Sequence, residues 1–441
     1  MSALPKEVQY NKPMASLPAD TTCQNVIVRP SNGSSFTTGG NIIQFDLPSH
    51  SFMVPSSLTL RVTFSSTVDT AGDTNIVWGV PAASWIERVE TIVGGNLIES
   101  VGSYGRLYNV IAQNKLNVAE KLALSTELGL GGSATGASSD ITTTANSGRA
   151  LSEAAPKSTF GFALPLGCLL SSCAELVPLG LIGGVRIQIT TAALVDFIQT
   201  QNNDPTISID DLELNFDLVS FGAAMNGVVA SMADAEGNLV MKSSGWNVNN
   251  ISTSVAASQS QDLIFNTRLS SIKSLIYQGT GEYQTNAAAS KPQGYVAAQV
   301  AGAAGSTQFF VASTPYPQTP LREANVAAVR SELRQAFGQT HDIYSSAACI
   351  QPTQYLELAA LAAADADILS TKPPCHFVGV NTEKLSTNSV MLSGVSSQLS
   401  PLNVRLLSSA AGNAAFTSTV FANYDAIIVI SVPQRQISVR V

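Results

Sequence analysis

Residues Trp85–Tyr108 read WIERVETIVGGNLIESVGSYGRLY, and this stretch decides the fold. The segments Trp85–Val93 and Asn96–Val101 are rich in aliphatic residues, and only Gly94 and Gly95 separate them. A two-residue glycine loop between two such segments is a strong signal for a β-hairpin, because tight hairpin turns need positive φ angles. The stretch therefore predicts two antiparallel strands joined by a Gly-Gly turn.

The hairpin also has an expected register. Counting outward from the turn places Ile92 opposite Leu97 and Glu90 opposite Glu99. Two like charges that face each other directly are mildly unfavourable in a sheet. Arg88 would lie diagonally across from Glu99 on the same face, where its charge would offset the repulsion.

Strand signals continue on both sides of the hairpin. Residues Ser57–Phe64 (SLTLRVTF) alternate between apolar and polar side chains, which is typical of a half-buried strand in an antiparallel sheet. Further segments with strand character are Asn41–Leu47, Thr159–Leu164, Val185–Thr190, Ile207–Val219, Asp262–Phe265, Ser270–Tyr277, Thr307–Val311, Cys375–Val380, Asn403–Leu407, Ala426–Val432 and Gln436–Val441.

Two segments have helical spacing instead. Arg106–Leu124 follows the hairpin, and Glu323–Phe337 places its apolar residues on one face. Gly338 suits the C-terminal cap of the second helix. The prolines of Pro315–Pro317 and Pro320 are expected to prevent a strand directly before that helix.

The order of elements divides the chain into two similar halves of about equal length. Each half has strands, an amphipathic helix and further strands, which fits a β-sandwich or jelly roll in each half. We expect an N-terminal arm over residues 1–40, a first β unit over 41–222, a linker over 223–245 and a second β unit over 246–441. The low-complexity stretch Gly129–Gly148 is expected to be a long exposed loop.

The composition narrows the class of protein. The 441 residues are 45% hydrophobic but only 12% charged, whereas ordinary soluble domains are about 25% charged. Such a surface favours a subunit that neighbours cover, or a neutral secreted domain. The net charge of −8 and the lack of a basic arm argue against nucleic-acid binding. No apolar run reaches the ~18 residues of a membrane span, and the N-terminus does not resemble a secretory signal.

Residues for catalysis or metal binding are scarce. The three histidines, His50, His341 and His376, lie in unrelated contexts, and no zinc motif occurs. Cys375 and His376 are neighbours, but adjacent residues of a strand point to opposite faces and would not form a nucleophile and base pair. The sequence therefore predicts no catalytic, cofactor-binding or metal-binding residues.

Carboxylates and glycines give similarly weak signals. Asp210 and Asp211, and also Asp365 and Asp367, are the clusters that could supply an acid and a base, and Asp365 and Asp367 could also hold Ca²⁺. An acidic loop or strand edge is the favoured interpretation of both clusters. The hairpin glutamates Glu87, Glu90 and Glu99 suggest a solvated face. Gly129–Gly132 and Gly183–Gly184 lack the features of a phosphate-binding loop.

The five cysteines are odd in number and contain no CxxC motif, so we expect free buried thiols. Whether Cys168 and Cys173 pair with each other stays open, since they are close in sequence. The five are Cys23, Cys168, Cys173, Cys349 and Cys375.

Several motifs resemble a known family. Ile92–Gly95 (IVGG), Leu97–Glu99 and Tyr104–Gly105 resemble the strand, turn and Tyr-Gly element in the first jelly roll of double jelly-roll major capsid proteins. In the second half, Phe377–Lys384 and Val390–Gly394 resemble late strands of the second jelly roll. That family forms the coats of the adenovirus, tectivirus, large eukaryotic DNA virus and virophage lineage.

The resemblance implies an all-β fold with few short helices, built as two tandem eight-stranded jelly-roll β-barrels. It also implies a structural, non-enzymatic coat protein of a DNA virus, which forms a pseudo-hexagonal homotrimer that tiles an icosahedral capsid. Implied partners are further capsomers, penton and minor capsid proteins and an internal membrane, without sequence-specific nucleic-acid binding. The protein would be located in the virion after assembly inside the host cell, with Gly129–Gly148 in an outer tower.

Two other functions fit parts of the sequence. A β-sandwich adhesin or fibre that binds glycans would need an aromatic groove, yet the tryptophans are only Trp78, Trp85 and Trp246. A β-sandwich hydrolase would use Asp365, Asp367 or Asp211. Loss of activity on an Asp→Asn change would identify the hydrolase.

Overall fold

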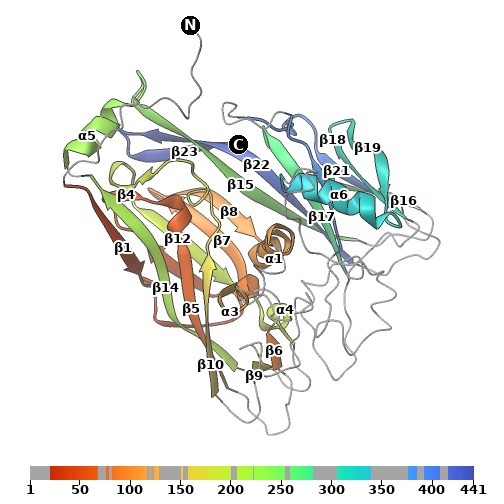
Figure 1. Cartoon of the computed structure of the whole chain (residues 1–441), viewed down its shortest axis with the longest axis horizontal. Helices are drawn as coiled ribbons and strands as arrows, with labels where there is room; N and C mark the ends of the chain where they lie inside the picture. The colour runs from red at the N-terminus through yellow and green to blue at the C-terminus, as the bar shows by residue number, and fades with distance from the viewer. Residues whose placement is uncertain are drawn as a thin grey trace, which may run out of the picture.

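The structure is a computed structural model, and it is mostly antiparallel β-sheet (Figure 1). It describes residues 20–67, 76–78, 82–116, 120, 124–128, 150–151, 157–199, 206–221, 223–253, 259–281, 305–338, 376–384, 392–407 and 416–441. The predicted loop Gly129–Gly148 lies outside these residues.

The first half of the chain forms two large sheets. The seven-stranded sheet has the order β10-β5-β14-β4-β11, with β1 and β2 also paired to β14. Its strands are β1 (Thr22–Val28), β2 (Ser35–Thr37), β4 (Phe52–Met53), β5 (Thr59–Thr67), β10 (Lys157–Pro165), β11 (Val177–Pro178) and β14 (Thr206–Ser220).

The second sheet of this half has the order β3-β12-β7-β8. Its strands are β3 (Ile42–Asp46), β12 (Val185–Thr191), β7 (Ile86–Val93) and β8 (Asn96–Gly102). A small separate sheet contains β6 (Ile76–Trp78), β9 (Ala150–Leu151) and β13 (Ile198–Gln199).

The second half repeats this plan with one sheet of five strands and one of four. The orders are β15-β22-β17-β20, with β23 added to β22, and β16-β21-β18-β19. The strands are β15 (Asn238–Thr253), β16 (Ser260–Phe265), β17 (Ile272–Gly281), β18 (Ser306–Val311), β19 (Thr314–Arg322), β20 (Phe377–Asn381), β21 (Leu402–Leu407), β22 (Phe416–Ser431) and β23 (Gln436–Arg440).

The two halves match strand by strand. In the first half β1 and β2 pair with β14, β14 with β5 and β5 with β10; in the second, β15 pairs with β22, β22 with β17 and β17 with β20. The remaining sheets, β3-β12-β7-β8 and β16-β21-β18-β19, have the same internal sequence order. Each half is therefore a jelly roll of two facing sheets.

Helices are few and short. In both halves one helix follows the edge strand that is third along the chain in the four-stranded sheet. In the first half α1 (Tyr104–Lys115) follows β8, and in the second α6 (Val326–Ala336) follows β19. Both were expected, although the first begins and ends earlier than predicted. The other described α-helices are α3 (Ser125–Leu128), α4 (Leu194–Phe197) and α5 (Ala223–Ser231). No described helix has the length and apolar character needed to cross a membrane.

Every second side chain of a strand points into the space between two facing sheets and is buried there. In β5 the residues Leu60, Val62 and Phe64 are at most 2% exposed. The Phe64 ring meets the buried Trp85 ring edge-on, with centroids 5.6 Å apart. The predicted pattern of half-buried strands is thus confirmed, and hydrophobic burial drives the folding of each half.

The predicted hairpin exists, but its register was wrong beyond the turn. Ile92 pairs with Leu97 as expected, and then an irregularity shifts the register so that Thr91 faces Glu99 and Glu90 faces Ser100. A bulge inserts one residue, and every later side chain of the strand then changes face.

The prolines before the second helix do not prevent a strand. β19 spans Thr314–Arg322 and includes all three prolines. It is the edge strand of its sheet and pairs only with β18, so a missing backbone N–H costs little on its open side. The prediction that these prolines end any strand was therefore wrong.

Two predicted connecting segments contain regular structure. Residues 1–40 were expected to be an arm, and within them β1 and β2 pair with β14. The expected linker 223–245 contains α5 and the first residues of β15. The strand pairs of the described residues stay within one half or the other, and β14 ends before α5 while β15 begins after it.

Candidate functional site

The outer face of the sheet β16-β21-β18-β19 presents apolar side chains to solvent. Ile264 is 62% exposed and Leu407 is 44% exposed. The guanidinium of Arg405 lies 4.8 Å from the centre of the Phe310 ring and pairs with Asp262, with 2.7 Å between Nε and Oδ1. Exposed apolar side chains with a polar border mark interaction surfaces. We call this surface the outer β16–β19 face.

The strand register gathers these residues into one patch. Ile264 pairs with Asn403, Asn403 pairs with Phe310, and Phe310 pairs with Pro315 of the edge strand. Directly paired residues point to the same side of a sheet and lie about 5 Å apart. Ile264, Phe310 and Pro315 therefore cross the face as an apolar row that Asn403 interrupts, and Leu407 lies apart from the row on β21. In Figure 1 this sheet lies at one side of the molecule, away from the first half.

The opposite side of the molecule has a different character. The outer face of the seven-stranded sheet carries acidic residues of β14. The Asp217 carboxylate accepts a hydrogen bond from Asn25 Nδ2 at 2.8 Å, and Arg29 pairs with Glu213 at 3.1 Å. This face is therefore polar, whereas the outer β16–β19 face combines exposed apolar side chains with an ion pair.

The two halves make direct contact through their inner sheets. The backbone N–H of Gly183 donates to the Arg435 carbonyl at 2.6 Å, and Ser243 Oγ donates to the Leu169 carbonyl at 2.6 Å. A Cβ at Gly183 would lie 3.0 Å from Gly94 Cα and 3.1 Å from the Arg435 carbonyl oxygen, so a side chain here would crowd both neighbours. These bonds fix the two jelly rolls against each other.

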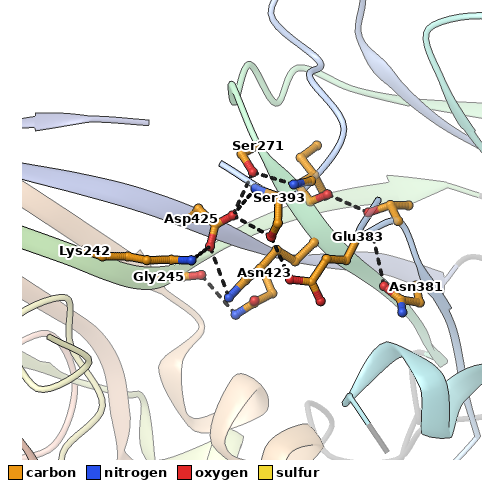
Figure 2. A network of polar contacts seen from close by, with 12 residues as sticks. Lys242, Gly245, Ser271, Asn381, Glu383, Ser393, Asn423 and Asp425 are labelled. Carbon is orange, nitrogen blue, oxygen red and sulfur yellow. Dashed lines mark hydrogen bonds and ion pairs between the residues drawn. The ribbon is translucent and has the colours of Figure 1, made fainter. Parts of the chain in front are cut away.

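The second half contains a polar network centred on Asp425, which is fully buried (Figure 2). Its Oδ2 accepts hydrogen bonds from Ser271 Oγ at 2.9 Å, from the Ser393 backbone N–H at 2.9 Å and from Ser393 Oγ at 3.0 Å. Its Oδ1 lies 3.4 Å from Lys273 Nζ and 3.9 Å from Lys242 Nζ. The network attaches the loop around Ser393 to β17 and β22.

The charge state of Asp425 follows from these partners. Burial alone would raise its pKa, but the hydrogen bonds from Ser393 and Ser271 and the charge of Lys273 outweigh burial and lower the pKa. The carboxylate therefore stays ionised at neutral pH. The hydrogen bonds to Oδ2 and the ion pairs at Oδ1 all come from groups of the protein itself, so Asp425 acts as a structural pin between these segments.

His376, which the sequence offered as a possible base, is buried in a second such pair. Its Nε2 lies 2.5 Å from Glu323 Oε2, and both side chains are 2% exposed. Thr307 Oγ1 donates to the other carboxylate oxygen of Glu323 at 2.6 Å. The pair joins β20 to the end of β19 inside the jelly roll. The pair is buried, and Cys375 lies outside the described residues.

The hairpin glutamates do not share one solvated face. Glu99 is 6% exposed and accepts a hydrogen bond from the Leu169 backbone N–H at 2.6 Å. Burial raises its pKa to about 7, against the lowering effect of this bond. Glu90, on the other face, accepts from Ser100 Oγ at 3.1 Å. The prediction of a solvated Glu99 was wrong because the bulge turns it inward.

The other candidate residues are not brought together. Asp211 has a φ of +45° at an irregularity of β14 and is exposed, whereas Asp210 is half-buried beside Ser35. His50 is exposed in a loop. No group of metal-ligating residues occurs in the part of the chain that the structure describes. The residues His341, Asp365, Asp367, Cys349 and Gly129–Gly132 lie outside the described residues.

The three described cysteines are free thiols. Cys168 and Cys173, whose pairing was left open, are both buried and unpaired with each other. Burial raises the pKa of Cys168 to about 11 and that of Cys173 to about 12, so both are inert.

Comparison with known proteins identifies the fold. No protein family and no curated protein sequence matches the chain. Among solved structures, the Faustovirus major capsid protein matches with a TM-score of 0.59 and 9% identity, covering 97% of this chain and 92% of that one. The PBCV-1 virus capsid matches with a TM-score of 0.54 and 12% identity, covering 95% and 97%.

The mavirus major capsid protein is a further match, with a TM-score of 0.52 and 11% identity, covering 100% of this chain and 95% of that one. These likenesses extend over both halves and over nearly the full length of each protein. Together with the matching strand orders, they confirm the predicted fold: the chain is an all-β protein with the double jelly-roll fold of these viral major capsid proteins.

Proposed function

We propose that the chain is the major capsid protein of a DNA virus and acts as a structural subunit without enzymatic activity. The observation that supports this most is the double jelly roll itself, matched along its whole length to major capsid proteins. The described interior is in keeping with this proposal: its buried ionisable groups Asp425, Glu323, His376 and Glu99 interact with other side chains and with backbone groups of the protein.

In this proposal, three copies form a pseudo-hexagonal homotrimer, and trimers tile an icosahedral shell in the virion. Two sheets face away from the contact between the halves, one at each side of the molecule (Figure 1). A contact between the outer β16–β19 face of one copy and the seven-stranded sheet of the next is head-to-tail, and such a contact closes into a ring of three when each copy is rotated by a third of a turn. The apolar row around Ile264 is the part of this contact that excludes water.

The proposal also covers organisation and partners. We propose that the first jelly roll is centred on residues 41–222 and the second on 246–441. The arm, residues 1–40, adds β1 and β2 to the first, and the connection, residues 223–245, adds the start of β15 to the second. Neighbouring capsomers, penton and minor capsid proteins and an internal membrane are the proposed partners. The net charge of −8 favours contacts of this kind over direct binding to the genome.

Size-exclusion chromatography with light scattering tests the proposed assembly. We expect the purified chain to have three times the 46.0 kDa mass of one chain. The variant Ile264→Asp, which places a charge at the β16 end of the apolar row, should fold normally and be monomeric. The control Leu97→Asp changes a side chain of similar exposure, 58%, away from that face, and should remain a trimer.

A stable wild-type monomer at micromolar concentration would contradict the trimer. A trimer that persists in Ile264→Asp would show that the copies meet through another surface. Circular dichroism of both variants confirms that any loss of mass comes from assembly and not from unfolding.

A further inference from the structure

An apolar cavity of about 460 Å³ lies where the two jelly rolls meet. Its wall comes from α1, from the loop that follows β10, and from residues 244–246 of β15. Cavities that bind small ligands have volumes of about 300–1,000 Å³ and mostly apolar walls. The apolar lining residues include Leu107, Tyr108, Ile111, Leu128, Leu166 and Trp246.

The polar groups of the wall bond to the protein itself. The backbone N–H of Gly167 donates to the Tyr104 hydroxyl at 2.7 Å, and that of Cys168 donates to Ser171 Oγ at 2.8 Å. Glu99 accepts the Leu169 N–H, and its raised pKa makes it less negative than an ordinary glutamate. The wall therefore offers few hydrogen bonds to water, and an alkyl chain would lose none by entering.

Lys115 at the C-terminal end of α1 gives this cavity a cationic side. It lines the cavity and keeps part of its side chain exposed. Desolvation of its ammonium group, and then the nearby charge of Lys273, lower its pKa. Among the described residues no carboxylate forms an ion pair with Lys115. An anionic group placed here would gain a partner and would relieve the repulsion between the two lysines.

We propose that the cavity binds a single-chain anionic amphiphile, with its alkyl chain between α1 and β15 and its carboxylate or phosphate head group at Lys115. Free fatty acids and the acyl chains of membrane lipids share this chemistry. The site touches both jelly rolls, so the ligand would stabilise their contact. This goes beyond the proposed coat function and does not depend on it.

Calorimetric titration and thermal unfolding of the full chain with decanoate test the proposal. We expect one decanoate bound for each chain and a higher unfolding temperature, because the ligand binds only the folded state. Decanol lacks the negative charge, and decyltrimethylammonium reverses it. Decanol should therefore bind about fivefold more weakly, and the cation should bind still less.

Two variants separate the alkyl site from the head-group site. Ile111→Trp fills the cavity from its partly buried position on α1 and should abolish decanoate binding. Lys115→Met should weaken decanoate about fivefold and leave decanol unchanged. The control Lys384→Met removes an exposed lysine outside the cavity wall and should change neither ligand.

Phosphatidylglycerol vesicles distinguish the two sources of the ligand. If wild-type protein sediments with vesicles and Ile111→Trp does not, a membrane lipid supplies the chain; decanoate binding without sedimentation assigns a free acid. Absent decanoate binding, or equal binding by Ile111→Trp, would overturn the proposal, and decanol binding as tightly as decanoate would overturn the head-group site. Light scattering on the same samples reports the trimer separately, so failure here and failure of the coat function are distinguishable.

Discussion

The two jelly rolls share one strand order but stabilise their interiors differently. The first half buries an almost continuous apolar set, centred on Trp85 and Phe64, with Glu99 as its buried carboxyl group. The second half adds polar pins to its apolar core, namely the Asp425 network and the pair of His376 with Glu323. The same strand order is therefore stabilised mainly by burial of apolar side chains in the first half, and by buried charged contacts as well in the second.

The strands that begin each half differ as well. β15 pairs with β22 along its full length of 16 residues, whereas the first half divides the same role between β1, with seven residues, and β2, with three. β1 is mostly exposed and pairs only with β14. The equivalence of the halves thus lies in the order of pairing and not in strand length.

The largest expected effect is on the apolar half. Trp85→Ala removes a fully buried ring and should lower the free energy of unfolding by about 4 kcal/mol, since large-to-small core changes leave a cavity. Chemical denaturation followed by circular dichroism measures the change. Leu97→Ala, at an exposed position of the same hairpin, is the control and should cost under about 0.5 kcal/mol.

Removing the central pin tests the polar half. Asp425→Ala leaves Ser271, Ser393 and Lys273 without their shared acceptor, and we expect a loss of about 3 kcal/mol. Asp262→Ala removes an exposed ion pair and should cost under about 1 kcal/mol. Similar losses for both variants would mean that the buried network does not stabilise the second half.

The two halves should respond to acid in opposite directions. The folded-state pKa of Glu99, about 7, lies above its ordinary value of 4.5. The contribution of Glu99 to the free energy of unfolding is therefore fully present below about pH 4.5 and is lost as the pH rises toward 7. The pKa of Asp425 is lowered from 3.8, so its contribution is lost as the pH falls below that value.

A series of unfolding measurements between pH 3 and pH 8 checks this difference. In the wild-type protein the Glu99 titration should lower the free energy of unfolding by an amount on the order of 2–3 kcal/mol between about pH 5 and pH 8, and Glu99→Gln should abolish this decrease. The loss of stability below about pH 4 should be the same in both proteins. If the wild-type protein and Glu99→Gln have parallel profiles over this range, Glu99 does not titrate as inferred.

The smallest effect concerns the turn that identified the fold. Gly94 has a φ of +57°, and a Cβ added to it would meet nothing within 4 Å, so a side chain fits but the backbone conformation becomes strained. Gly94→Val should cost about 1–2 kcal/mol, measured by thermal unfolding. Gly184→Val, at a glycine without a positive φ and with equally open space, is the matched control.

Most strands could be predicted from sequence because burial of one face imposes a period of two along each strand. The limits came from non-local geometry. The bulge in the hairpin reversed the side on which Glu99 lies, and no residue type near it announces that shift. The sequence did not predict β19, because prolines normally interrupt a strand. They are tolerated in β19 because it is an edge strand, and its edge position follows from the order of strands in the sheet.

The polar pins could not be found from sequence for a similar reason. Asp425 bonds to Ser271 and Ser393, which are 154 and 32 residues away, and Glu323 meets His376 across the sheet. Asp425 stands between Tyr424 and Ala426, and no pattern in these neighbouring residues indicates that its carboxylate is buried and hydrogen-bonded. The apolar cavity was equally hidden, because its wall unites α1 with a strand of the other half.

The exposed position of β1 has a practical consequence for work with this protein. Of the three described thiols, only that of Cys23 is open to solvent, on a strand with one unpaired edge. Under air, disulfide-linked dimers would form at Cys23 before they form at the buried Cys168 or Cys173, and they would imitate specific oligomers on a non-reducing gel. Purification in the presence of a reducing agent, or a Cys23→Ser background, keeps that artefact out of every measurement of mass.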